Sequence, residues 1–216
     1  MTIARYRRIL EVLGNRQPDL AVLAEAVYKP HNLSAILRSC DAVGIGLVHA
    51  VDPTGGVPTF QATSASAEKW VSVKVHQNLE DASKLLRDKG MQLLAAHLSV
   101  EAVDYRSIDY RQPTCIIVGN ERHGVSKQAA ELADEHIIIP MLGMVRSLNV
   151  SVAAAIILFE AQRQRWEAGH YRHPRLEPED IHKQAFAWLH PQEAQRLAAA
   201  GQPFPPLAED GSIQGG

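Results

Sequence analysis

Residues 115–156, CIIVGNERHGVSKQAAELADEHIIIPMLGMVRSLNVSVAAAI, decide the fold, because strand and helix patterns alternate within them. CIIV (115–118) and HIIIP (136–140) are short apolar runs of the kind that form buried strands. SKQAAELAD (126–134) between them has helical spacing, and a long helical pattern runs from 149 to 169. Strands that alternate with helices predict a mostly parallel sheet.

The upstream part of the chain continues this alternation. Strands are predicted at 22–27, 46–51, 70–75 and 91–98, and helices at 33–43 and 79–90. The first of these helices stops at Gly44 and the second is closed by Gly90, and glycine is a common residue at helix C-termini. We therefore expect an α/β fold in which helices cover both faces of a mostly parallel sheet.

The length of 216 residues suits one such domain with short extensions. Beyond residue 174 the pattern decays into sequence that contains Pro and acidic residues, with one short amphipathic piece at 183–190. We expect this tail to be loosely ordered. The predicted organisation is an arginine-bearing N-terminal extension (1–20), an α/β domain (21–170) and an acidic C-terminal extension (171–216).

Composition argues against several classes of protein. The longest apolar run, 152–159, is too short to span a bilayer, and the first residues do not have the layout of a signal peptide, so we expect a cytoplasmic protein with no membrane partner. Cys40 and Cys115 stand in apolar surroundings and suit reduced core thiols. The ten histidines form no HExxH motif and have no CxxC partner, so we expect no metal.

The net charge of −2 hides an uneven distribution. The tail from 176 onward holds six acidic and two basic residues, a net −4, so residues 1–175 carry a net +2. Exposed helix faces often mix Arg and Glu in this way, but arginine in place of lysine favours phosphate recognition. The arginines of the two segments that flank the α/β domain are Arg5, Arg7, Arg8, Arg16, Arg163, Arg165, Arg172 and Arg175.

Polar residues follow three of the predicted strands, at the sheet edge where open α/β proteins bind ligands. Asn32 and Arg38 follow the first strand, Glu121 follows CIIV, and Ser147 and Asn149 follow HIIIP. Each has a simpler explanation when taken alone, because Asn and Ser are common N-caps, Arg can lie along its helix, and a loop Glu can be solvated. Their joint appearance, with glycines in the second and third loops, favours one shared site.

The loop GNERHG (119–124) is not the glycine fingerprint of dinucleotide-binding folds, and no acidic residue lies at the expected distance after a first strand. The chain also has no P-loop lysine motif. A nucleotide-dependent metabolic enzyme of Rossmann type is therefore a weakly supported alternative.

Three segments together resemble the signature motifs of the SpoU (TrmH) branch of the SPOUT RNA methyltransferases. These segments are HNLSAILR (31–38), IIVGNERHGVS (116–126) and IIIPMLGMVRSLNVSVAAA (137–155). The family transfers a methyl group from S-adenosylmethionine to a ribose 2'-hydroxyl of RNA. Residues 4–173 are most similar to family members that methylate guanosine 18 in the D-loop of tRNA, and the short N-terminal extension is more like theirs than like that of ribosomal RNA enzymes.

The resemblance implies a deep trefoil knot at about 115–160, an exception to the rule that chains are unknotted. It also implies a homodimer that packs through helices of the knot region, so that residues 152–161 form interface as well as core. S-adenosylmethionine is the implied cofactor, and no metal is needed. The residues implied to hold the cofactor are Ala96, Gly119, Asn120, Ile139, Met141, Gly143, Leu148 and Asn149.

The resemblance gives Arg38 the central catalytic role, with Asn32, Glu121, Ser147 and Asn149 around it. A guanidinium does not readily lose its proton, so we expect Arg38 to bind an RNA phosphate and stabilise the developing oxyanion, with a neighbouring phosphate as one candidate proton acceptor. The residues expected to bind the tRNA backbone are Arg8, Arg16, His31, Arg163, Arg165 and Arg172. Methylation of another RNA position, or RNA binding without catalysis, are the alternatives within this fold.

Overall fold

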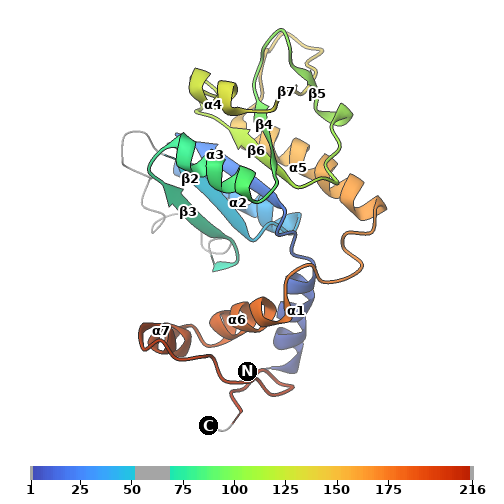
Figure 1. Ribbon diagram of the computed structural model, residues 1–216. Helices are drawn as coiled ribbons and strands as arrows, with labels where there is room; N and C mark the ends of the chain where they lie inside the picture. Colours follow the sequence, from blue (N-terminus) through green and yellow to red (C-terminus); the bar gives the residue numbers. More distant parts are fainter. Residues whose placement is uncertain (1, 52–68, 215–216) are drawn as a thin grey trace. The chain divides into compact units, whose positions relative to one another are not determined.

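The computed structural model describes residues 2–51 and 69–214, and its described strands form one seven-stranded sheet in the order β3-β2-β1-β6-β4-β7-β5 (Figure 1). Every neighbouring pair is parallel. The strands are β1 (Leu20–Glu25), β2 (Leu47–Val51), β3 (Ser72–His76), β4 (Gln92–Ala96), β5 (Val103–Asp104), β6 (Thr114–Val118) and β7 (Glu135–Ile138). The predicted parallel sheet is thereby confirmed.

The chain divides into two compact units, which we call the sheet unit (Pro18–Ala168) and the helical unit (Met1–Gln17 with Gly169–Gly216). The helices of the sheet unit are α2 (Pro30–Ala42), α3 (Leu79–Asp88), α4 (Lys127–Leu132) and α5 (Val150–Glu167), with a short 3-10 helix η2 (Tyr105–Ser107). The helices of the helical unit are α1 (Ile3–Gly14), α6 (Pro178–Leu189) and α7 (Pro191–Ala199).

Both faces of the sheet are covered, because side chains alternate along each buried strand. In β1, Leu20, Val22 and Ala24 join an apolar cluster with residues of α2 and α5. Ala21 and Leu23 join a second cluster with residues of α3 and α4. The helices predicted upstream and in 115–156 all form, within a few residues of the expected bounds.

The tail that we expected to be loosely ordered contains two helices with buried apolar residues. Leu189 and Ala185 of α6 pack with Ile9 and Leu13 of α1, and Phe186 stacks on Phe204 with ring centroids 4.7 Å apart. Pro178 and Pro191 occupy first-turn positions of α6 and α7, where proline starts a helix and does not interrupt it. The N-terminal extension is likewise a helix that shares a core with this tail.

Cys40 and Cys115 are free and fully buried, as expected for core thiols. Among the described residues, no helix has the length and apolar content needed to cross a membrane. The same part of the chain contains no group of three or more His, Cys, Asp or Glu side chains arranged to hold a metal ion.

Candidate functional site

Hydrogen bonds between side chains join the three polar loops at the carboxyl edge of the sheet. Asn32 Nδ2 donates to Glu121 Oε1 at 2.8 Å, and Asn149 Nδ2 donates to Asn32 Oδ1 at 3.1 Å. Glu121 Oε1 also accepts from the backbone amide of Lys29 at 3.0 Å. Asn32 is 2% exposed, so its amide is a buried link between the loop after β6 and the start of α5.

Helix capping explains only one of these residues. Asn149 is the N-cap of α5, and its Oδ1 accepts from the amide of Ser151 at 2.8 Å while its Nδ2 remains available for Asn32. Asn32 lies inside the first turn of α2, where Lys29 is the N-cap, and Ser147 lies exposed before α5. The predicted shared site therefore includes Asn32, Glu121 and Asn149.

Hydrogen bonds and close backbone packing within the loop fix the conformation of the segment that carries Glu121. Asn120 and Gly124 exchange backbone hydrogen bonds, and Asn120 Nδ2 donates to the carbonyl oxygen of Ala26 at 3.0 Å. Ala26 has a φ of 50°, an uncommon conformation for a residue with a side chain. A Cβ on Gly119 would overlap the backbone of Gly124 and Val125, so only glycine permits this close approach.

Glu25 is a buried residue of this region that the sequence reasoning missed. It is 5% exposed at the end of β1, and its Oε2 accepts from the amide of Ser126 at 2.9 Å. It ties the far end of the 119–126 loop to β1. An acidic residue at the end of an otherwise apolar strand pattern was the available signal.

The carboxylate of Glu121 is ionised at neutral pH. Partial burial raises its pKa, but hydrogen bonds from Asn32 and from the amide of Lys29 outweigh burial and leave the pKa below its ordinary value. A negative charge thus stands beside the start of α2.

Several residues expected to hold the cofactor lie around one edge of the sheet. Ala96 ends β4, Gly119 follows β6 and Ile139 follows β7, and these three strands are neighbours and parallel. No hydrogen bond joins the backbone of residues 140–148 to any residue that the structure describes. Leu142 and Met144 in this segment are fully exposed. A segment with free backbone donors and acceptors beside apolar side chains fits a nucleoside ligand.

The structure does not bring Arg38 into the hydrogen-bonded cluster. Arg38 is exposed on α2, and its side chain makes no hydrogen bond or ion pair with any residue that the structure describes. Six residues separate it from Asn32, which is about 240° around a helix axis, so the two side chains leave α2 on different sides. That Arg38 shares one site with Asn32 therefore stays a prediction.

The arginines expected to bind RNA divide into buried and exposed groups. Arg165 is fully buried, and Arg16 is 2% exposed with its guanidinium 5.6 Å from the ring centroid of Trp188. These two cannot present a guanidinium fork to RNA as predicted, because the fork is enclosed by protein. Arg163 is half-exposed and pairs with Glu160 at 2.7 Å.

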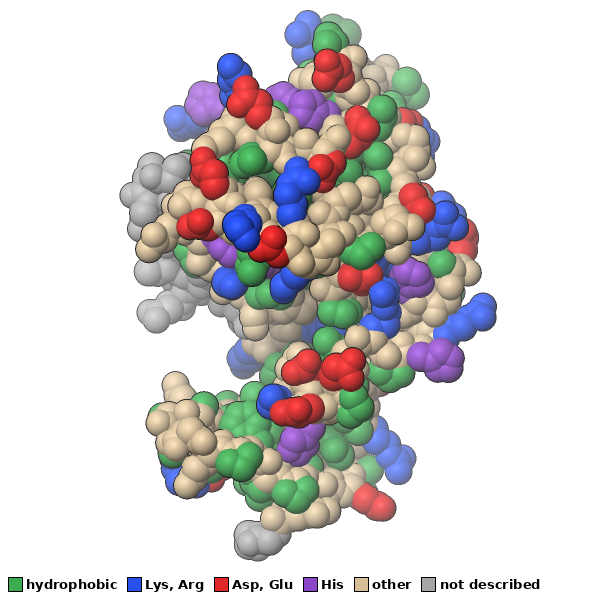
Figure 2. All heavy atoms as spheres, viewed as in Figure 1, with side chains coloured by type: hydrophobic (Ala, Val, Ile, Leu, Met, Phe, Trp, Pro, Cys, Tyr) green, Lys and Arg blue, Asp and Glu red, His purple; other side chains and the backbone are tan. Residues whose placement is uncertain are grey.

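The exposed group consists of Arg8, His31 and Arg172, together with Arg5 and Arg7 of α1. Arg8 pairs with Glu11 at 2.8 Å on the same helix. On the face shown in Figure 2, basic and acidic side chains are interspersed. Exposed ion pairs of this kind are weak enough to exchange an acidic partner for a phosphate.

The protein thus has an α/β fold with a polar cluster at the carboxyl ends of the central strands, the edge where open α/β sheets bind their ligands. The chain belongs to the SpoU rRNA Methylase family, whose model matches residues 19–159. The model of the SpoU rRNA methylase C-terminal region matches residues 163–215, so the family match extends beyond residue 173, where the resemblance of the sequence motifs ended.

The chain is similar over nearly its whole length to tRNA (guanosine(18)-2'-O)-methyltransferases. Identity is 58% to the Thermus thermophilus enzyme, over 87% of this chain and 97% of the relative. It is 49% to the Escherichia coli enzyme, over 99% of this chain and 94% of the relative. Among solved structures, the Aquifex aeolicus TrmH/SpoU tRNA modifying enzyme has 44% identity and a TM-score of 0.81, over 86% of this chain and 94% of that one.

A solved structure with a bound ligand is also similar. The AdoMet-bound rRNA methyltransferase from Sinorhizobium meliloti has 32% identity and a TM-score of 0.60, and the match covers 71% of this chain and 59% of that one.

Proposed function

We propose that this protein transfers a methyl group from S-adenosylmethionine to the ribose 2'-hydroxyl of guanosine 18 in tRNA. The observation that carries the proposal is the 49% identity to the Escherichia coli tRNA enzyme over 99% of this chain, which spans both the sheet unit and the helical unit. The Asn32 cluster agrees with it, because that cluster joins the three segments that resemble the family motifs.

The residues present fit the cofactor. Gly119, Ile139 and Met141 would contact its adenosine part through their backbones, and the free backbone groups of 140–148 are available for such contacts. Ala96, Asn120, Gly143, Leu148 and Asn149 complete the proposed cofactor site. When bound, S-adenosylmethionine would supply the methyl group from its sulfonium, and a neighbouring RNA phosphate is the candidate acceptor for the proton of the 2'-hydroxyl.

The protein's part in this displacement is alignment and electrostatics. Arg38 would bind an RNA phosphate and stabilise the charge that develops on the 2'-oxygen, since its exposed guanidinium has no protein partner among the described residues. Glu121, already ionised, would hold Asn32 and the start of α2 in place. Ser147 lies exposed in the loop before α5 and would contact the substrate.

Contacts with tRNA would come from the exposed basic residues. On α1 these are Arg5, Arg7 and Arg8, and elsewhere they are His31, Arg163 and Arg172. Such contacts make binding depend on salt, because phosphate neutralisation releases counterions. A tRNA-modifying role agrees with a cytoplasmic location.

The trefoil knot is part of the proposal. β7 lies between β4 and β5, although these two strands precede it and are consecutive in the chain. A strand that inserts between two earlier neighbours is compatible with a threaded chain, and this supports the proposed knot. An experimental structure that traces 97–149 without a break tests this directly.

A homodimer is also part of the proposal. Val152, Phe159 and Trp166 of α5 are 46%, 51% and 64% exposed and recur every seven residues, which places an apolar stripe on one side of the helix. We expect Phe159→Glu to shift the protein from dimer to monomer in sedimentation equilibrium. A monomer before substitution would contradict the dimer.

Methylation of another RNA is the second candidate. A Ralstonia nicotianae 23S rRNA (guanosine-2'-O-)-methyltransferase is 37% identical over 70% of this chain, but the match covers only 61% of that relative. Since the tRNA relatives match over nearly their full lengths, the tRNA assignment has the stronger support.

The role of Arg38 tests the mechanism. We expect Arg38→Ala to lower kcat for tRNA by at least about 100-fold, because an oxyanion donor is lost, while the Kd for S-adenosylmethionine stays within two-fold or so. Arg87→Ala is the matched control, since Arg87 is a partly exposed arginine paired with Asp134. Methyl transfer by Arg38→Ala at the control rate would contradict the role.

A further inference from the structure

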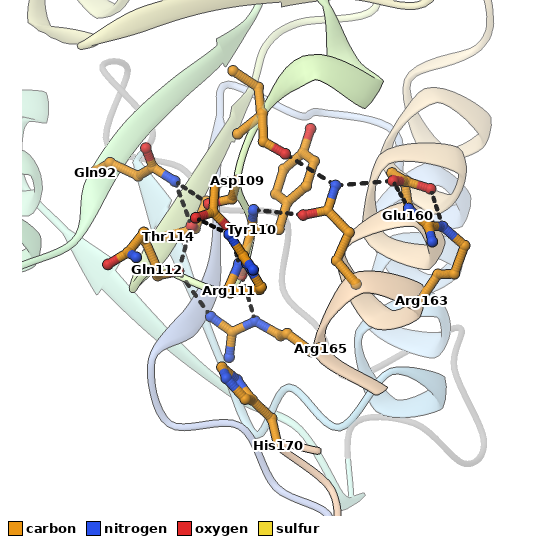
Figure 3. A network of polar contacts seen from close by, with 12 residues as sticks. Gln92, Asp109, Tyr110, Arg111, Gln112, Thr114, Glu160, Arg163, Arg165 and His170 are labelled. Atoms are coloured by element: carbon orange, nitrogen blue, oxygen red, sulfur yellow. Dashed lines mark hydrogen bonds and ion pairs between the residues drawn. The ribbon is translucent and has the colours of Figure 1, made fainter. Parts of the chain in front are cut away.

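Arg165 is a fully buried arginine whose hydrogen bonds join three separate segments of the sheet unit. Nε donates to the carbonyl oxygen of Tyr110 at 2.8 Å, and Nη2 donates to that of Gln112 at 3.0 Å (Figure 3). Nη1 donates to Asp19 Oδ1 at 2.7 Å, and Nη2 also reaches the carbonyl oxygen of Asp19 at 3.1 Å. The planar guanidinium group donates to several acceptors at fixed angles, and a lysine ammonium group cannot reproduce this arrangement.

The neighbouring residue strengthens the same connection. Gln164 Oε1 accepts from the amide of Tyr110 at 3.0 Å, and its Nε2 donates to the carbonyl oxygen of Ile108 at 2.9 Å. The last turns of α5 are thus bound to residues 108–112, as Figure 3 shows. The carbonyl oxygen of Asp19 also accepts from the amide of Thr114, so β1 and β6 begin at this point.

This cluster marks the two places where the chain passes between the units. The chain enters the sheet unit at Pro18, next to Asp19, and leaves it after Ala168, three residues beyond Arg165. The ion pair between Asp19 and Arg165 therefore holds the entering and leaving segments together within the sheet unit. It lies at the amino ends of β1 and β6, away from the Asn32 cluster at their carboxyl ends.

We propose that Arg165 is a positioning residue for tRNA binding, which fixes the two connections to the helical unit and does not touch RNA. This inference rests on the proposed tRNA methyl transfer. Two linked binding units gain affinity only when their geometry lets both engage one ligand. Loosening the shared anchor point would lower that gain while leaving each unit's own surface intact.

The test compares Arg165→Lys and Asp19→Asn with Arg106→Lys, a matched control at an exposed arginine of the same unit that pairs with Asp104. The measurements are KM for tRNA, KM for S-adenosylmethionine and direct tRNA affinity, at a temperature at which every variant is folded. We expect the first two variants to raise KM and Kd for tRNA at least about ten-fold, with KM for S-adenosylmethionine unchanged. We expect Arg106→Lys to change neither quantity by more than about two-fold, because exposed ion pairs contribute little.

Asp19→Asn decides between positioning and direct RNA contact. If Arg165 bound a phosphate, removing the neighbouring carboxylate charge would leave tRNA binding unchanged or tighten it. If Arg165 positions the connections, the same substitution weakens tRNA binding. Asp19→Asn also keeps the inference testable if Arg165→Lys does not fold.

Unchanged tRNA affinity in both folded variants would overturn the inference, as would tighter binding in Asp19→Asn. Failure of the unaltered protein to methylate tRNA would contradict the proposed function instead. The tRNA affinities of the variants would then still test the role of Arg165.

Discussion

At the scale of single residues, Asn32 shows how one side chain serves several segments. Its amide group donates to Glu121 and accepts from Asn149, so both ends of the side chain are used in a buried position. A carboxylate of the same shape would accept from Asn149 but would meet Glu121 with a like charge.

Asn32→Asp isolates that charge effect. The two carboxyl groups would share a proton, so the pKa of the pair in the folded state rises above its unfolded value and stability is lost as pH rises. We expect the free energy of unfolding to fall by about 2 kcal/mol between pH 4 and pH 8 relative to the unaltered protein, with methyl transfer reduced about 100-fold at pH 8. Denaturant titrations at several pH values measure the first effect. Gln77→Glu, an exposed amide-to-carboxylate change, should show neither.

His49 predicts a pH dependence in the unaltered protein. It is 1% exposed, its Nδ1 lies 2.8 Å from His76 Nε2, and burial followed by the charges of His76, Lys89 and Lys74 lowers its pKa from 6.5 to about 4. The unfolded chain binds this proton below pH 6.5 and the folded protein only near pH 4, so stability falls as pH drops between these values.

We expect this decrease to approach about 3 kcal/mol. The measurement is the free energy of unfolding between pH 4 and pH 7. His49→Gln should flatten the profile, and an equally steep profile in that variant would show that other groups cause it.

Burial was the property of single residues that the sequence predicted least well. Asn32, Glu121 and Asn149 were identified because their positions after strands place them at one sheet edge. Arg16 and Arg165 were assigned to the surface, because arginine is rarely buried unless it is paired and their partners lie far away in sequence. Asp19 and Arg165 are 146 positions apart, a separation that no local pattern spans.

At the scale of elements, the strands and helices of the sheet unit could be predicted because each has a clear period and an end signal. β5 was missed because it has only two residues, too few to show a period. Of α6 only the amphipathic piece at 183–190 was predicted, and α7 was missed. α6 packs on α1, which lies at the other end of the sequence, and α7 packs on α6, so no local pattern shows their partners.

The prediction at the scale of elements concerns the 119–126 loop. Gly119→Ala would push a Cβ into the backbone of Gly124 and Val125, so we expect a loss of about 2–3 kcal/mol in unfolding free energy and weaker binding of S-adenosylmethionine. Gly143→Ala is the control, because a Cβ there meets nothing within 4 Å. We expect its stability to change by less than about 0.5 kcal/mol. Equal stability of the two variants would contradict the close approach at Gly119.

At the scale of the whole molecule, the chain combines a sheet unit, which holds the polar cluster, with a helical unit built from both chain ends. Relatives that match over nearly the full chain are tRNA enzymes, whereas the ribosomal RNA relative matches over 70% of it. This difference in coverage supports the proposed tRNA substrate over a ribosomal one.

The central claim is methyl transfer to guanosine 18 of tRNA, and one measurement tests it most directly. Labelled S-adenosylmethionine is incubated with an unmodified tRNA transcript, with the same transcript carrying another nucleotide at position 18, and with ribosomal RNA. We predict label only in the transcript with guanosine at that position. Equal labelling of the substituted transcript, or labelling of ribosomal RNA alone, would contradict the claim.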